Sequence, residues 1–320
     1  MTREHHQLQP FEQQRVTIRE NFQRFKEQHP EALCAPLNLS WSNWGFGLES
    51  LAQSAKRLAD AGLQFIELHG NHYGDRIGYQ PQETLRILAD HGLTVSGVCG
   101  MFSADNDLSS NNPFARQQAL DYIARELDFL GEVGGDYLLV VPAAVGRPQP
   151  YDQYEQQRST QTLALALEWF DRQHVVAAIE PIRSAEVSIV HTVDEALAYI
   201  GELGNHEMLG INGDLYHMLT EEDSIPDALL RAGDRLTNLH LADTNRRALG
   251  TGFLDIDSII MTLYMMGYNR PGKYVTPEPL GPAADPYVAR NGVTDCKQLD
   301  ELVQQTVSYF RQREAIVREG

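Results

Sequence analysis

Short runs of Val, Ile and Leu recur along the chain and alternate with longer segments whose apolar positions have the period of a helix. The apolar runs predict strands at 33–40, 64–69, 93–99, 136–142, 174–180, 208–214, 236–241 and 273–278. Helices are predicted between them, for example at 48–61, 115–132 and 161–173. Gly134 stands at a helix-to-strand turn, where a left-handed residue commonly ends a helix. Eight such alternations predict a parallel sheet and fit a closed (β/α)8 TIM barrel better than an open sheet.

The two ends of the chain extend this pattern. Residues 10–28 precede the first predicted strand and predict an additional helix, which either covers the barrel bottom, contacts another subunit or is a solvated cap. Residues 297–314 have the pattern of the helix that follows the eighth strand. We therefore expect an N-terminal helical extension at 1–32 and a single (β/α)8 barrel domain at 33–320.

Composition and charge narrow the class of protein. Hydrophobic residues make up 42% and charged residues 22% of the 320 positions, as in ordinary soluble proteins, and no apolar run has the roughly 18 residues of a membrane span. The N-terminus lacks the apolar core of a signal peptide, so we expect a cytoplasmic protein without a membrane partner. The formal net charge of −18 argues against nucleic acid as a partner, because binding phosphates requires a basic face. Cys34, Cys99 and Cys296 form no CxxC pair and are interpreted as buried apolar residues.

Four side chains that can bind a metal stand at the ends of the last four predicted strands. They are Glu180, Asp214, His240 and Glu278. Because the carboxyl ends of barrel strands build the active site, we expect these side chains to converge. One carboxylate there is usually a helix cap, but four ligand-type residues in succession are harder to explain that way, and buried carboxylates repel one another unless a cation lies between them. The set suits Mn²⁺ or Mg²⁺, with Co²⁺ or Zn²⁺ as alternatives.

Each of these residues lies in a longer motif. The motifs are EPIRSAE (Glu180 and Glu186), DLYHMLTEE (Asp214 and His217), HLADTNRRALGTGFLDID (His240 and Arg246) and TPEP (Glu278). Together they resemble the xylose isomerase-like barrel superfamily, and within it most closely the D-tagatose/D-psicose 3-epimerase group of sugar isomerases and epimerases. The resemblance covers residues 33–320, although its specific motifs lie within 178–280.

The resemblance implies a metal-dependent enzyme in which Glu180 and Glu278 both bind the cation and act as base and acid. A proton removed next to a sugar carbonyl would give an enediolate. Its return to the same carbon gives an epimer, whereas its return to the neighbouring carbon gives an aldose, so 3-epimerisation and aldose–ketose isomerisation both stay open. Sugar binding is assigned to a further set, which is Asn38, Trp41, His69, Glu186, His217 and Arg246.

Alternatives stay open for some of these assignments. His217 could be a core histidine, and Glu186 could form a salt bridge with Arg183. Few basic residues lie near the ligands, so we expect an unphosphorylated sugar, although Arg147, Arg183 and Arg247 could bind a phosphate. The alternative functions are a metal-dependent dehydratase of the inosose or dehydroshikimate type and a non-catalytic sugar-binding barrel. A homo-oligomer, either a dimer or a tetramer, is expected by analogy, and the proline-rich segment after the eighth strand could cover the pocket or contact a subunit.

Overall fold

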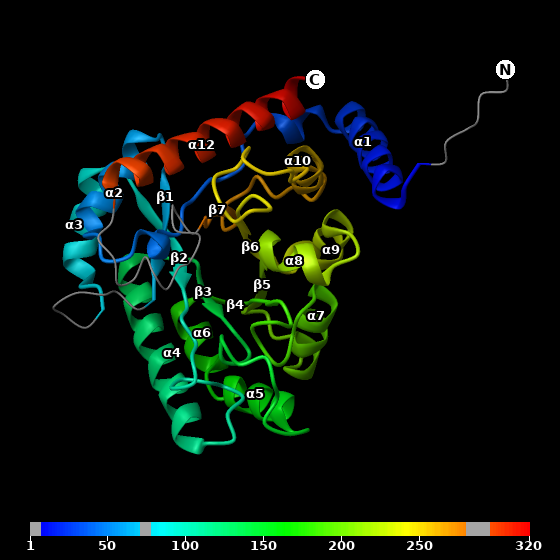
Figure 1. Cartoon of the computed structure of the whole chain (residues 1–320). Coiled ribbons are helices and arrows are strands. Elements are labelled where there is room, and N and C mark those ends of the chain that lie inside the picture. Colours follow the sequence, from blue (N-terminus) through cyan, green and yellow to red (C-terminus); the bar gives the residue numbers. More distant parts are fainter. Residues whose placement is uncertain (1–7, 71–77, 280–294) are drawn as a thin grey trace.

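The apolar runs form a parallel sheet that curves into a barrel in the computed structural model, which describes residues 8–70, 78–279 and 295–320 (Figure 1). The sheet has seven strands, and each pairs in parallel with the next in chain order. The strands are β1 (Phe65–His69), β2 (Thr94–Cys99), β3 (Tyr137–Val140), β4 (Val176–Ile179), β5 (Leu209–Asp214), β6 (Leu236–Leu241) and β7 (Tyr274–Pro277). These correspond to the second to eighth predicted strands.

The first predicted strand is not regular, but its residues close the barrel between β7 and β1. Leu39 pairs with Val275 of β7, and Ser42 pairs with Glu67 of β1, each as an isolated parallel bridge. The amide of Glu67 also donates to the carbonyl of Trp41 (2.8 Å). The predicted TIM barrel is therefore confirmed, with an irregular segment in place of its first strand.

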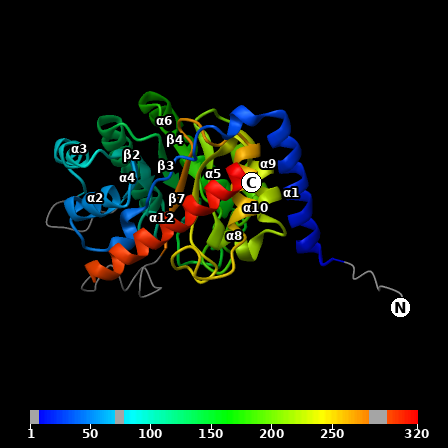
Figure 2. The same cartoon turned by 90° about the horizontal axis from the view of Figure 1, so that it is seen from above.

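Helices follow the strands and cover the outside of the barrel (Figure 1 and Figure 2). They are α2 (Leu51–Asp60), α3 (Pro81–Asp90), α4 (Pro113–Val133), α5 (Glu155–Ala164), α6 (Leu167–Gln173), α7 (Val193–Glu202), α8 (Leu215–Glu221), α9 (Ile225–Ala232), α10 (Ile256–Met265) and α12 (Cys296–Glu319), with 3-10 turns η1 (Pro30–Leu33), η2 (Asn43–Phe46) and η3 (Gly233–Arg235). Gly134 ends α4 with φ of 82°, the left-handed conformation expected there. None of the helices in the described ranges combines the length and the apolar character that crossing a bilayer demands.

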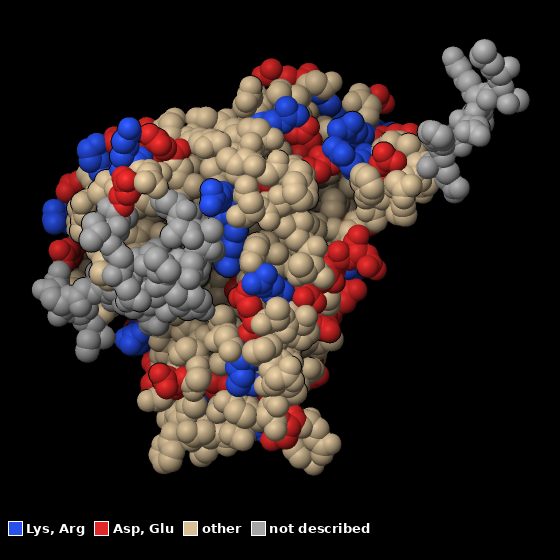
Figure 3. Space-filling view, in the orientation of Figure 1, with Lys and Arg blue, Asp and Glu red and all other residues tan. Residues whose placement is uncertain are grey.

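The N-terminal extension contains the predicted helix, α1 (Pro10–Gln28), which packs against α10 at the periphery (Figure 1). Ile18 and Phe22 are its buried residues. Arg15 forms an ion pair (2.5 Å) with Asp255, the N-cap of α10. The extension is thus attached to the barrel wall, whereas most of the proline-rich segment after β7 lies outside the described residues. On the face drawn in Figure 3, acidic and basic side chains are interspersed.

Side chains inside the barrel form layers because successive strand residues point to opposite faces. An apolar layer near the amino ends of the strands consists of Phe65, Tyr137, Val176, Ala178 and Tyr274. Two residues further along three of these strands, the side chains are polar: Glu67 follows Phe65, Thr276 follows Tyr274, and Glu180 follows Ala178. The carboxyl ends of the strands therefore place polar groups above a packed apolar layer.

The last helix, α12, fixes the segment that closes the barrel. Its Glu314, which is 2% exposed, accepts hydrogen bonds from the Leu37 amide (2.7 Å), the Tyr264 hydroxyl of α10 (2.8 Å) and the Arg311 guanidinium (2.7 Å). One buried carboxylate thus connects the irregular first strand to two helices.

We expect Glu314→Ala to lower the free energy of unfolding by about 3 kcal/mol, because three donors lose their shared acceptor and two of them are buried. Denaturation in urea, followed by circular dichroism, measures the change. Glu301 on the same helix forms an exposed pair with Lys297 (3.7 Å), so Glu301→Ala should cost less than about 0.5 kcal/mol. Equal effects of the two substitutions would contradict this role of Glu314.

Candidate metal and active site

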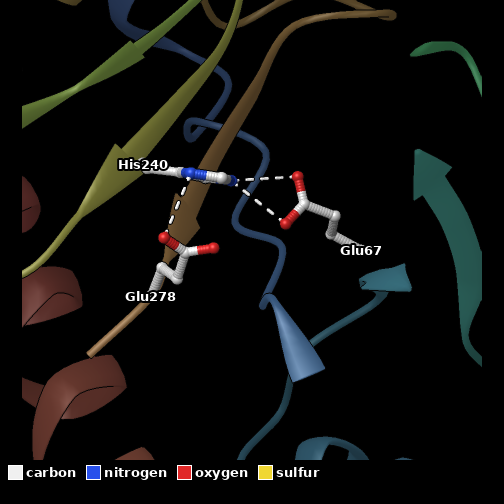
Figure 4. A group of neighbouring side chains, drawn as sticks. All are labelled: Glu67, His240 and Glu278. Carbon is white, nitrogen blue, oxygen red and sulfur yellow. Dashed lines mark hydrogen bonds and ion pairs between the residues drawn. The ribbon is translucent and has the colours of Figure 1, made fainter. Parts of the chain in front are cut away.

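The four predicted metal ligands come together at the carboxyl ends of β4 to β7, and all four are buried. One ligand atom each of Glu180, Asp214 and His240 lie within 4.8 Å of one another, and the same holds for His240, Glu278 and Glu67. Figure 4 shows the second group, in which Glu278 and Glu67 approach opposite nitrogens of the His240 ring. The structure thus brings the predicted set together and adds Glu67 from β1.

Hydrogen bonds from the protein fix one carboxylate oxygen of Glu180, which follows β4, and one of Asp214, which ends β5. Glu180 Oε1 accepts a hydrogen bond from the side-chain amide of Asn212 (2.8 Å). Asp214 Oδ1 accepts from the backbone N–H of Tyr216 (2.8 Å), because Asp214 is also the N-cap of α8. Holding one oxygen orients the carboxylate and leaves the second oxygen for a cation.

Glu278 is oriented in the same way from the other side of the barrel. Its Oε1 accepts hydrogen bonds from the Trp44 indole N–H and from the Cys99 thiol (Sγ to Oε1, 3.6 Å). Its Oε2 lies 3.4 Å from His240 Nδ1. Cys99 is buried, as predicted, whereas Cys34 and Cys296 are exposed, so the interpretation of those two as buried apolar residues is wrong.

The converging carboxylates change the proton affinities of the site. Burial raises the pKa of Glu278 to about 8, His240 opposes this rise, and Asp214, Glu67 and Glu180 add to it. Burial disfavours a charged His240, but the carboxylates of Glu278 and Glu67 outweigh burial and raise the pKa of the ring well above its usual value. The pKa of Glu278 is thus raised mainly by burial, and that of His240 by the neighbouring carboxylates. Three buried carboxylates with one imidazole therefore fit a divalent cation.

Two predicted sugar-binding side chains lie in segments that follow the ligand-bearing strands, His217 in α8 and Arg246 in the loop after β6. His217 is buried, with Nε2 3.4 Å from Asp214 Oδ2, and its Nδ1 has no hydrogen-bond partner in the described part of the chain. The guanidinium of Arg246 lies 4.1 Å from the centre of the Tyr216 ring. Arg246 also has φ of 57°, a left-handed conformation that non-glycine residues rarely adopt. His217 thus lies beside a predicted ligand, whereas Arg246 packs on Tyr216, two residues after the ligand Asp214.

Glu186 and His69, also predicted to bind sugar, are already engaged. Glu186 forms an ion pair with Arg183, so the salt bridge named as its alternative is present. His69 is buried, and its ring centre lies 6.3 Å from that of Trp44, which in turn contacts Glu278. His69 therefore lies in the layer of side chains next to the ligands.

Asn38 and Trp41, the remaining predicted sugar-binding residues, do not reach the site. The Asn38 amide donates to backbone carbonyls just before β7, among them that of Lys273 (3.1 Å), at the opposite end of the barrel. Trp41 is 1% exposed and stacks on Phe46 (5.9 Å between ring centres), so it belongs to the packing core. Trp44 is the tryptophan of this segment that contacts a ligand. Leu39 pairs with Val275 near the start of β7, which places Asn38 near the amino ends of the strands.

The sequence analysis missed a buried polar layer directly beneath the ligands. Thr276 donates to Asn238 Oδ1 (2.6 Å), and Asn238 donates to Asn212 Oδ1 (2.8 Å). Glu67 lies within 3.0 Å of His240 Nε2 through both carboxylate oxygens. The sequence does contain a signal for this layer. Two residues before a predicted ligand, three strands carry a polar residue, which is Asn212, Asn238 or Thr276. Such spacing places a polar side chain under the ligand on the same face.

The loop that carries Arg246 is held by Asp243. Asp243 Oδ2 accepts from the amide of Gly250 (2.8 Å), and Oδ1 accepts from that of Leu254 (3.2 Å). A Cβ atom at Gly252 would lie 2.2 Å from Asp243 Oδ1, so the backbone must be free of a side chain there. Burial opposes ionisation of Asp243, but these backbone donors lower its pKa. The Gly-x-Gly turn thus allows the loop to close around a charged carboxylate.

Comparison with known proteins places these features in context. The family model described as xylose isomerase-like TIM barrel matches residues 55–291. The chain is 28% identical over 228 residues to a ketose 3-epimerase of Arthrobacter globiformis (71% of this chain, 77% of the relative) and 27% identical over 242 residues to 3-dehydro-D-guloside 4-epimerase of Escherichia coli strain K12 (72% and 89%). The crystal structure of D-allulose 3-epimerase from Methylomonas sp. in complex with D-allulose shares the fold, with a TM-score of 0.74 at 24% identity (87% of this chain, 98% of the other). The named relatives support the expected enzyme class.

We expect Asp214→Asn to lower the metal affinity by 10-fold to 100-fold or more, because an amide oxygen is a weaker ligand than a carboxylate. The asparagine oxygen can still accept from Tyr216, so α8 should stay capped. Elemental analysis after dialysis measures the bound metal. The matched control is Asp223→Asn, which changes an exposed aspartate just after α8. If Asp214→Asn retained as much metal as the control, the ligand assignment would be wrong.

Proposed function

The chain belongs to the xylose isomerase-like TIM barrel family, and on this premise we propose that it is a divalent-metal-dependent sugar epimerase. The main support for the proposal is that two buried carboxylates approach the same nitrogen of one imidazole ring. Glu180 Oε1 lies 3.6 Å and Glu278 Oε2 lies 3.4 Å from His240 Nδ1. The proposal holds that Glu180, Asp214, His240 and Glu278 bind the cation, and that Glu180 and Glu278 also transfer protons.

The names of the relatives support a particular kind of epimerisation. A ketose 3-epimerase and a 3-dehydro-D-guloside 4-epimerase carry out their reactions on different sugars. Both names nevertheless describe inversion at a carbon next to a ketone, if the ketose carries its carbonyl at carbon 2. The C–H bond of such a carbon is acidic enough for a carboxylate to break once the carbonyl is polarised. We therefore propose that this chain inverts a hydroxyl-bearing carbon adjacent to a ketone.

Inversion requires that a proton leave one face of the carbon and that a proton return to the other face. Glu180 follows β4 and Glu278 follows β7, and two strands separate them in the barrel wall. Their carboxylates therefore approach the space at the strand ends from different directions. A bound divalent cation would supply Lewis-acid polarisation of the ketone. One carboxylate removes the proton and the other returns one, and the roles exchange in the reverse reaction.

The arginines near the site support a sugar without a phosphate group. Arg147 is bound by the buried carboxylates of Asp107 (2.9 Å) and Glu155. Arg183 is paired with Glu186. Two of the three arginines considered for phosphate binding thus already have anionic partners. Sugar hydroxyl groups, unlike a phosphate, need no cationic side chain, because neutral hydrogen-bonding groups are sufficient to bind them.

The homo-oligomer stays an expectation by analogy, and the cytoplasmic location and the domain boundaries stay expectations from the sequence. Neither the dehydratase nor the non-catalytic alternative is favoured by a specific contact within the described residues. A barrel that only binds sugar has no need of two carboxylates poised at one reacting carbon.

Incubation with unphosphorylated ketoses in D₂O should place deuterium at the carbon next to the ketone and produce the epimer. Proton NMR measures both, after the metal has been removed with EDTA to end the reaction. Enzyme treated with EDTA beforehand should show neither change. An aldose product would indicate isomerisation instead, and the absence of exchange on neutral and phosphorylated ketoses alike would contradict the proposal.

Two-base catalysis predicts that Glu180→Gln and Glu278→Gln each reduce epimerisation at least about 100-fold, since each removes one proton-transfer group. Each variant should still exchange deuterium into the one epimer whose proton faces the remaining carboxylate, and the two variants should differ in which epimer that is. Metal content is measured alongside, with the exposed Glu168→Gln as the control. Exchange into both epimers by either variant would show that its missing carboxylate transfers no proton.

A further inference from the structure

Glu67 is a buried carboxylate for which the proposed reaction has no use. It lies in β1 with no exposed surface, and both of its oxygens lie 3.0 Å from His240 Nε2. Together with His240 and Glu278 it forms a second group whose ligand atoms are close enough to hold a metal. The geometry therefore allows two roles for Glu67, either a ligand of a second cation or a hydrogen-bond acceptor for the histidine.

The other neighbours of Glu67 favour the role of an acceptor. The Tyr137 hydroxyl donates to Glu67 Oε2 (2.7 Å), and the Asn238 amide approaches the same oxygen (3.3 Å). Burial, together with the charge of Glu67, raises the pKa of Tyr137 well above its usual value, so the hydroxyl keeps the proton that it donates. The Tyr137 ring is packed so tightly on Gly97 that a Cβ there would lie 2.6 Å from it. These donors thus hold the carboxylate in place.

The two nitrogens of His240 face different surroundings. Nε2 faces Glu67, whereas Nδ1 faces Glu278 at 3.4 Å (Figure 4). Glu180 also approaches Nδ1, at 3.6 Å. A neutral imidazole carries its proton on one nitrogen and has a lone pair for a metal on the other. A proton on Nε2, donated to Glu67, therefore leaves the lone pair of Nδ1 directed at the two predicted catalytic carboxylates.

We infer that Glu67 is a positioning residue that fixes the proton of His240 on Nε2 and so confines a single metal to the Nδ1 side. A carboxylate that accepts from the far nitrogen of a metal-bound histidine orients the ring and increases its basicity, and loss of such a partner commonly costs 10-fold to 100-fold in metal affinity. The inference rests on the proposed metal site but is independent of which sugar reacts there.

The test uses Glu67→Gln, which keeps the shape of the side chain. The glutamine amide can donate as well as accept, so it no longer imposes a proton on Nε2. We expect Zn²⁺ affinity, measured by competition with a chelator, to fall 10-fold to 100-fold, with one ion bound per chain before and after the change. Ser40→Ala is the control, because Ser40 is equally buried and its hydroxyl hydrogen-bonds to the Ser96 hydroxyl (2.8 Å) rather than to Glu67 or His240.

A spectroscopic measurement separates positioning from a general loss of structure. In ¹⁵N NMR of the Zn²⁺-loaded protein, His240 should show a protonated Nε2 and a metal-bound Nδ1 in the wild type and in Tyr137→Phe, which leaves the carboxylate in place. A Zn²⁺-bound Nε2, two ions per wild-type chain, or unchanged affinity in Glu67→Gln would each overturn the inference. If the wild type bound no metal at all, the proposed metal site itself would fail, which is a distinguishable result.

Discussion

The site depends on one contact, in which the His240 ring is approached by carboxylates at both of its nitrogens. Moving several carboxylates out of water is unfavourable unless their charge is compensated and their oxygens are hydrogen-bonded. The barrel meets the second condition with donors from the layer beneath, such as Asn212 to Glu180 (2.8 Å) and Tyr137 to Glu67 (2.7 Å). The first condition is the reason that the geometry fits a divalent cation. The polar layer thus supplies the hydrogen bonds that the buried carboxylates need, and a cation bound by the candidate ligands would compensate their charge.

Regular strands were predictable because their apolar runs are short and bounded by turns, and β1 to β7 each match a predicted range within a few residues. The first strand could not be located in the same way. Its residues form no regular strand in the described part of the chain, although isolated bridges and backbone hydrogen bonds, such as that from the Val275 amide to the Asn38 carbonyl (2.9 Å), join them to β7 and β1. Asn38 and Trp41 were assigned to sugar binding by the resemblance, whereas the contact to Glu278 comes from Trp44 in a 3-10 turn.

Candidate ligands were recognisable because a charged residue at the end of an apolar strand has a defined position in a barrel. Residues whose role depends on a partner far along the chain were not. Glu67 is adjacent in sequence to apolar residues of β1, and its significance arises from His240, which lies 173 positions away. The loop arginines were equally ambiguous, because sequence alone does not show that Arg183 is paired with Glu186.

The closure of the barrel has a consequence for how the site is assembled during synthesis. Trp44 and Glu67 belong to the first quarter of the chain, whereas Glu278 follows the last strand, and Glu314 of α12 fixes the closing segment. Contacts of such large sequence separation form late and slowly in folding. On the ribosome, residues near the carboxyl terminus must emerge before the seam between β7 and the first segment can close. The complete set of candidate ligands therefore comes together only after nearly the whole chain has been synthesised.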